Sequence, residues 1–177
     1  MLKTAAKKLQ QQGMLAYVEL MMGIVGRGLV AASAVDDVMK KEFRGFAAGT
    51  VIQMHVLPDG PGFALEVEAE GKLRLLKTPP EQVHIGVRFK HLTHAFLVLS
   101  FQEGTATAFA HDRMYVDGDI SLALRLVRCL NRMEILILPR LVAERAVKRY
   151  PEITLRHKLS QGGRIYSHLA LNFLRGE

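Results

Sequence analysis

The spacing of apolar residues changes along the chain from helical to alternating and back, which divides the chain into elements. Strong helix formers in residues 2–12, an apolar segment at 14–22 and apolar residues at helical spacing in 35–46 predict three helices. Gly13 is expected to separate the first two. In residues 50–89, apolar and polar positions alternate in four runs joined by short turns, which predicts four strands. We expect these strands to form an antiparallel meander with one buried side and one solvent-facing side.

Two shorter helices, a fifth strand and a long helix are predicted in the second half of the chain. The two helices cover Thr93–Gln102 and Ala106–Ala110, and the strand covers Arg113–Asp117. A Gly-Asp turn follows, where Asp119 or Ser121 can accept hydrogen bonds from the first N–H groups of the long helix. This order predicts an α+β fold, with a five-stranded, mostly antiparallel sheet, helices packed on one face of it, and helical extensions at both ends.

The long helix has two faces of different chemistry. One face is apolar, because five residues recur at spacings of three and four: Leu122, Leu126, Cys129, Leu130 and Met133. A different face carries three arginines: Arg125, Arg128 and Arg132. An apolar run at residues 134–138 then leads to Pro139, which suits the first turn of another helix. The spacing of Ile165, Leu169 and Phe173 predicts a last amphipathic helix.

The net charge of +7 is concentrated in one part of the chain. From residue 120 onward there are eleven Lys and Arg residues against four Asp and Glu, whereas residues 1–119 carry thirteen of each. This asymmetry fits an anionic partner, such as membrane headgroups, a phosphate-bearing ligand or nucleic acid. A solvated basic face that keeps the protein soluble is the alternative.

The arginine face has two functional interpretations. Arg125, Arg128, Arg132 and Arg140 are predicted to contact the anionic headgroups of a membrane while the apolar run at 135–138 enters it. Binding of nucleic acid is disfavoured, because Tyr150 is the aromatic residue of this basic block and one ring makes a poor stacking platform.

The N-terminal segment has some features of a secretory signal, namely lysines, then an apolar stretch at 14–30, then the small residues at 32–34. Glu19 and Arg27 interrupt that stretch. They also argue against a transmembrane helix, since each charge costs about 2.5–3.5 kcal/mol at mid-bilayer. We therefore expect a helical pair that packs on the domain or rests on a membrane surface. The single cysteine excludes an intramolecular disulfide and suits a reducing compartment.

Few residues are spaced for catalysis. His91 and His94 could share a metal, but no acidic or cysteine partner is near them in sequence. Cys129 falls on the apolar helix face, where a thiol is inert. Asp119 is explained as a helix cap, and Asp112 and Asp117 as solvated side chains. We predict neither an enzyme nor a bound metal or cofactor.

Several segments resemble the sterol carrier protein type two (SCP-2) lipid-binding family. They are a hairpin at Glu70-Gly71-Lys72-Leu73, the strand Val83–Phe89, the helix Leu92–Phe101, and the strand that runs through Asp117-Gly118-Asp119 into an apolar helix. The resemblance covers about residues 40–133. Where the family often has Gly-Lys before the last strand, this chain has His111-Asp112-Arg113. Its helical arm, and a long helix continuing through a proline, are most similar to the accessory lipid-binding proteins of bacterial ubiquinone biosynthesis.

The resemblance implies a non-catalytic carrier with an apolar tunnel for an isoprenoid-tailed quinone precursor. A general fatty-acyl or sterol-like carrier and a basic nucleic-acid-binding module are the alternatives, and a filled core is the alternative to a tunnel. Other biosynthetic proteins are expected partners, in the cytoplasm and peripheral to the inner membrane. The expected parts are an arm (1–37), the SCP-2-like domain (38–138) and a basic helical extension (139–177). The predicted lipid contacts are Met54, Leu65, Val67, Leu75, Ile85, Val87, Phe96, Phe109, Leu122, Leu126 and Leu130.

Overall fold

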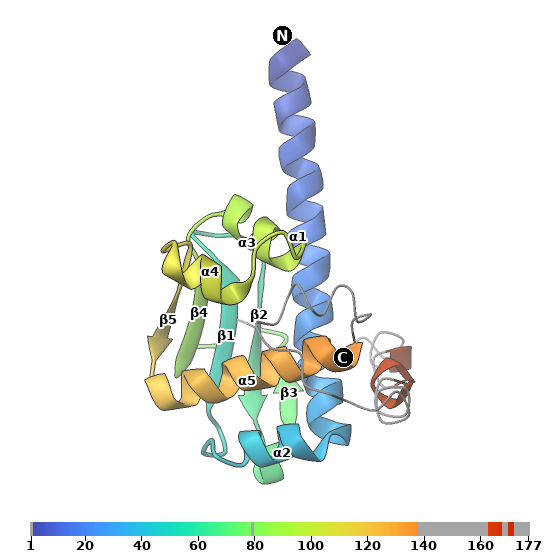
Figure 1. Cartoon of the computed structure of the whole chain (residues 1–177), viewed down its shortest axis with the longest axis vertical. Coiled ribbons are helices and arrows are strands. Elements are labelled where there is room, and N and C mark those ends of the chain that lie inside the picture. The colour runs from blue at the N-terminus through green and yellow to red at the C-terminus, as the bar shows by residue number, and fades with distance from the viewer. Residues whose placement is uncertain (1, 79, 138–162, 168–169, 172–177) are drawn as a thin grey trace.

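The computed structural model describes residues 2–78, 80–137, 163–167 and 170–171. In this part of the chain, helices cover one side of a five-stranded sheet, and the fold is α+β as predicted (Figure 1). The predicted helix that starts at Pro139 lies outside the described residues, as does Arg140. Ile165 lies in a helical segment at 163–167 and is buried in the core.

The sheet has the strand order β3-β2-β1-β4-β5. Its strands are β1 (Val51–Val56), β2 (Gly62–Val67), β3 (Leu73–Leu75), β4 (Ile85–Phe89) and β5 (Met114–Gly118). The β1–β2, β2–β3 and β4–β5 pairs are antiparallel, whereas β1 and β4 are parallel, with Ile52 opposite Ile85. The prediction of a mostly antiparallel sheet is therefore confirmed.

The predicted meander of four successive strands is wrong at its last step. After β3, the chain crosses to the other side of β1 before it forms β4, and two parallel strands require such a crossover. The backbone N–H of His84 donates to the carbonyl of Val51 (2.9 Å), which brings the crossover back beside β1. Apolar alternation is the same in parallel and antiparallel strands, so the pattern could not reveal this step.

The register aligns apolar side chains on one face of the sheet. Ile52 pairs with both Leu65 and Ile85, and Met54 pairs with Val87, so these residues share a face across three strands. All of them are buried. The opposite face carries polar side chains such as Gln53. The prediction of one buried and one solvent-facing side is confirmed for the sheet.

The helices are α1 (Leu2–Val35), α2 (Asp37–Phe43), α3 (Leu92–Leu99), α4 (Thr105–Ala110) and α5 (Ile120–Ile137), with a 3₁₀ turn, η1, at Ala69–Gly71. The expected break at Gly13 is wrong, since α1 is one continuous helix of 34 residues. A single glycine costs a helix only about 0.5–1 kcal/mol relative to alanine. Strong helix formers on both sides of Gly13 outweigh that cost.

The first part of α1 extends away from the domain, and the second part packs on it (Figure 1). By length and composition, the segment Lys7–Val35 could cross a membrane, but half of it is buried inside the protein. Ala32 and Ser33, in the segment that resembles a cleavage site, are buried too. The apolar character of the second half of α1 is therefore explained by packing.

The start of one helix agrees with the sequence prediction, and the starts of two others differ from it. The Asp119 carboxylate accepts from the Leu122 N–H (2.9 Å), as predicted. Asp36 lies inside the helix predicted at 35–46, but in the structure it precedes α2 as its cap and accepts from the Met39 N–H (2.9 Å). The helix predicted to start at Thr93 begins one residue earlier, at Leu92, with His91 at the cap position and no capping side-chain hydrogen bond.

Candidate functional site

The predicted lipid contacts all lie in one apolar cluster between the sheet and the helices. Six are core members of the cluster: Met54, Leu65, Val67, Ile85, Val87 and Leu126. Five are partly buried and pack against it: Leu75, Phe96, Phe109, Leu122 and Leu130. The structure brings these residues together from seven elements, but it does not test their contact with a lipid, which stays a prediction.

The cluster has a floor and a roof built from distant parts of the sequence. Its floor is the apolar face of the sheet. Its roof is α5, whose Leu126, Cys129 and Met133 are buried against the same cluster. Val18, Met22 and Leu29 of α1 belong to it as well. Aliphatic, methionine and phenylalanine side chains without directional polar groups suit a long hydrocarbon chain.

A cleft of about 490 Å³ opens beside the cluster, between α1 and the edge strand β3. Val30, Leu73 and Leu75 line it, and all three belong to the apolar cluster or pack against it. Arg27 and Lys77 line the same cleft. It therefore combines apolar side chains that reach the core with cationic side chains. Leu75 is the one residue of this cleft that the sequence predicted as a lipid contact.

The charges around this cleft are partly paired. Arg74 and the acidic Glu68 also line it. Arg74 donates to Glu66 and lies 3.1 Å from Glu68. Both contacts are on exposed side chains, where an ion pair contributes little to stability. Sequence reasoning missed the cleft because its two walls are about 45 residues apart in the chain, and no local pattern joins Arg27 to Lys77.

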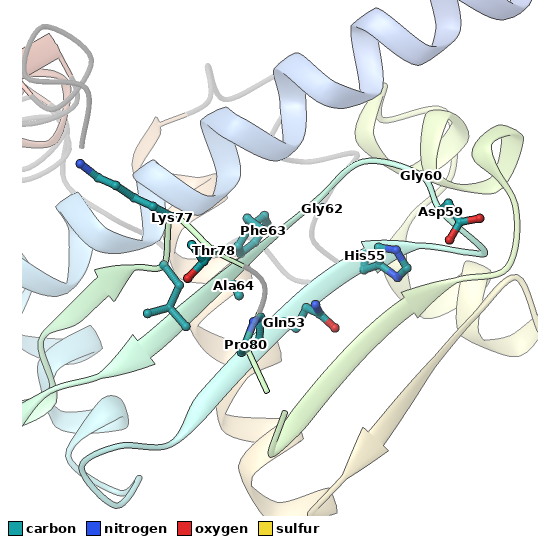
Figure 2. A pocket seen from close by; sticks show the side chains of 11 residues that line it. Gln53, His55, Asp59, Gly60, Gly62, Phe63, Ala64, Lys77, Thr78 and Pro80 are labelled. Carbon is teal, nitrogen blue, oxygen red and sulfur yellow. The ribbon is translucent and has the colours of Figure 1, made fainter. Parts of the chain in front are cut away.

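A second cavity, of about 410 Å³, lies on the polar face of the sheet (Figure 2). Gln53 and His55 of β1 line it together with Thr78 and Pro80 of the crossover. Nδ1 of His55 is buried without a hydrogen-bond partner, and burial, followed by the nearby Arg88 charge, lowers the pKa of this imidazole. Polar and apolar groups line this cavity in similar measure, and it lies on the polar face of the sheet, so it suits a hydrocarbon chain less well than the cleft beside β3.

The arginine face of α5 contacts acidic side chains of the same chain. Arg128 donates to both carboxylate oxygens of Glu42 (3.0 and 2.9 Å), and Arg125 donates to the same carboxylate (3.3 Å). The hydrogen bond from Arg128 lowers the pKa of Glu42. Arg132 donates to the buried Asp36 (2.9 Å). An anionic ligand would compete with these carboxylates, and the predicted anion contact stays a prediction.

Two residues of the apolar run that was expected to enter a membrane are internal. Ile135 and Leu136 belong to the end of α5 and are buried within the protein. The expectation is therefore wrong for these two residues, because their side chains pack inside the chain instead. Leu138 lies outside the described residues.

Burial raises the pKa of two side chains of α5. Desolvation raises the pKa of the Cys129 thiol to about 12, and the side chain is 1% exposed. This agrees with the interpretation of Cys129 as an inert buried thiol. Desolvation also raises the pKa of Glu134 to about 7, and its Oε2 atom is buried without a hydrogen-bond partner.

His91 and His94 do not form part of a metal site with other described residues. The rings of His91 and His94 lie 5.1 Å apart, edge to face, and burial lowers the pKa of His94. Among the described residues, no three His, Cys, Asp or Glu side chains are grouped so that they could hold a metal ion. Asp112 is paired with Lys90.

Comparison with curated proteins finds no match. The solved structures that resemble the chain include "UbiJ-SCP2 Ubiquinone synthesis protein", with 14% sequence identity and a TM-score of 0.42, covering 72% of this chain and 98% of that one. Sterol carrier protein 2 from Yarrowia lipolytica, in its apo form, has 13% identity and a TM-score of 0.40, covering 62% and 86%. Palmitated SCP2L2 from Aedes aegypti has 13% identity and a TM-score of 0.35, covering 55% and 92%.

A family model matches residues 31–131, more than half of the chain, and these residues contain α2, the whole sheet and most of α5. The match includes the strand and helix around Asp119 that carried the resemblance in the sequence. The chain belongs to the SCP-2 sterol transfer family, and residues 31–131 are a lipid-binding carrier domain.

Proposed function

We propose that this chain holds an isoprenoid-tailed lipid in its apolar cluster and presents it to enzymes of ubiquinone biosynthesis, without catalysing a reaction itself. The observation that carries the proposal is the single apolar cluster, which gathers all eleven predicted contacts and reaches an open cleft at β3. Each CH₂ group that a ligand buries there contributes about 0.8 kcal/mol, so a chain of ten carbons can bind firmly without an ion pair.

The cleft between α1 and β3 is the proposed site for the polar end of the ligand. Val30 and Leu73 would contact the first carbons of the chain, and the cations Arg27 and Lys77 would lie near an anionic or strongly polar headgroup. Amphipathic ligands favour such a combination, because the tail leaves water while the head keeps polar partners.

The narrower role in quinone synthesis rests on the sequence arrangement of the arm, the Gly-Asp turn and the long helix. We further propose that the protein works in the cytoplasm, at the surface of the inner membrane. The pairing of Arg125, Arg128 and Arg132 with carboxylates makes the nucleic-acid alternative less attractive, since less positive charge is available for phosphates.

The test is organic extraction and mass spectrometry of the full chain purified from its own host. A prenylated aromatic compound in stoichiometric amount is the expected result. Fatty acids or sterol-like lipids alone would favour the general carrier, and no lipid at all would favour a filled core.

Two matched variants of α5 make the test specific for the cluster. In Leu130→Trp the indole occupies space next to the cluster, so bound lipid should fall several-fold. Leu124→Trp is the control, because Leu124 lies on the same helix but is 56% exposed, and this variant should retain its lipid. Equal lipid loss in both variants would contradict a ligand in the cluster.

A further inference from the structure

Helix α1 is apolar on the side that faces away from the domain as well as on the side that packs against it. Leu9, Gly13, Ala16 and Leu20 are all exposed, and Leu9 and Leu20 are 72% and 56% exposed. At 3.6 residues per turn these four positions lie within about 60° of one another and form one stripe, here named the outer stripe. Residues such as Val18 and Met22 are buried on the opposite side. Within the part of the chain that the structure describes, the packing of one chain leaves the outer stripe exposed.

Gly13, in the middle of the outer stripe, is not required by the fold of one chain. A Cβ atom at this position would meet no other atom within 4 Å. Glycine within a helix costs about 0.5–1 kcal/mol relative to alanine. A small residue at this place is useful if the backbone of another helix approaches closely, and Ala16, one turn further along the stripe, is small as well.

We propose that the outer stripe pairs with the same stripe of a second copy of this chain, in an antiparallel arrangement. In the self-complementary register, Leu9 lies opposite Leu20 of the second copy, and Gly13 lies opposite Ala16 of the second copy. Small residues then meet at the centre, where the two helices are closest, and leucines cover both ends. A two-fold axis relates the two stripes, as in most homodimers.

Charge complementarity selects this orientation. Lys8 and Glu19 are both exposed and lie on the same flank of the outer stripe. Antiparallel helices place equal flanks against each other, so Lys8 lies beside Glu19 of the second copy, twice in each dimer. A parallel pair would instead bring the N-terminal lysines of both copies together, where like charges repel.

The outer stripe is accessible, because the first part of α1 extends beyond the domain (Figure 1). A pair of helices of this length buries an area near the lower end of what a specific interface needs, about 1,000 Å². We therefore expect dimerisation that depends on concentration.

The test is sedimentation velocity of the full chain from about 1 to 100 µM, where dissociation constants in the micromolar range are measurable. The wild-type chain should shift from monomer to dimer. Lys8→Glu and Glu19→Lys should each weaken the dimer about tenfold, and the double variant should restore it. Gly13→Gln should also weaken the dimer, although it favours the helix.

Lys7→Glu is the matched control: it makes the same change of charge one residue away, on the side remote from the stripe, and should leave the dimer unchanged. A chain that stays monomeric at every concentration would overturn the proposal. So would a dimer that Lys8→Glu and Gly13→Gln do not affect, or a monomer whose arm binds vesicles of anionic phospholipid through the same stripe.

Discussion

The apolar and arginine faces of α5 differ in how far the rest of the protein covers them. Leu126 and Cys129 on the apolar face are nearly inaccessible to solvent. Along the arginine face the cover changes gradually: the Arg132 side chain is 18% exposed beside Asp36, whereas Arg128 is 53% exposed beside Glu42. One face therefore belongs to the core along most of the helix, and the other does so mainly near its C-terminal end.

This difference shows that a count of basic residues overstates the positive surface that a partner can reach. Three arginines from the charge-rich part of the chain are compensated by Asp36 and Glu42, which belong to the part with no net charge. Their first effect is to hold α5 against α2. An anionic surface would have to replace Glu42 before it could use Arg125 or Arg128.

The largest effect is expected where the arginine face is most buried. Asp36→Ala removes the carboxylate that pairs with Arg132 and accepts from the Met39 N–H. Because the variant leaves a largely buried arginine without its partner, the free energy of unfolding should fall by about 3–5 kcal/mol. Guanidinium denaturation followed by circular dichroism measures this loss. Asp36→Asn keeps an oxygen for the cap and should lose about 1 kcal/mol less. A loss below about 1 kcal/mol in Asp36→Ala would show that the pair is not structural.

The apolar face is tested by Leu126→Ala, at a side chain that is 2% exposed. We expect a loss of about 2–5 kcal/mol in the free energy of unfolding, because the substitution leaves a cavity in the cluster. Leu124→Ala, on the exposed side of α5, should change it by no more than about 0.5 kcal/mol. Similar losses in both variants would mean that the two sides of α5 are equally covered.

Glu134 is an acidic side chain on α5 whose Oε2 atom is buried without a hydrogen-bond partner, and it makes stability depend on pH. Its pKa is raised to about 7 by burial, so the folded chain holds this proton more tightly than the unfolded chain does. The protonated side chain therefore contributes stability that is fully present below about pH 4.5. This contribution is lost as the pH rises through about 7, and the free energy of unfolding falls by up to about 3 kcal/mol. Denaturation curves between pH 5 and 8 should show this decline, and Glu134→Gln should remove it. An equal decline in the variant would assign it to another group.

The smallest effect is expected at the exposed end of the arginine face. Glu42→Gln removes the charge that pairs with Arg125 and Arg128, and each exposed pair contributes about 0.2–1 kcal/mol. The same substitution leaves both arginines available to anions. Binding to anionic vesicles should therefore increase, and salt should suppress the increase. Unchanged vesicle binding would argue against a role of this face at membranes.

Much of the fold was predictable from local patterns. The strand phases of Ile52, Met54 and Val56, the Asp119 cap and the apolar face of α5 follow from spacing alone, and all are present in the structure. The gathering of the predicted contacts into one cluster follows from these phases, since each strand places its apolar side on the same face of the sheet.

What could not be predicted depends on pairing between distant residues. The parallel β1–β4 pair, the cleft at β3, and the ion pairs of Arg128 with Glu42 each join segments that are more than thirty positions apart. The continuity of α1 through Gly13 was missed for a different reason. The preference of one glycine against a helix is small, and the sum of the helix preferences of the residues around it decides the outcome.

The parallel pairing of β1 with β4 has a consequence for how the chain folds. The β1–β2 and β2–β3 pairs form between neighbours in sequence, whereas the β1–β4 pair joins Ile52 to Ile85 across 33 positions. The loop that must close for this contact is longer, so its entropy cost is larger. We expect the hairpins to form first, with β4 docking later and bringing β5 and α5 with it. The floor of the apolar cluster would then be completed before its roof, and a newly made chain would expose that floor for a time.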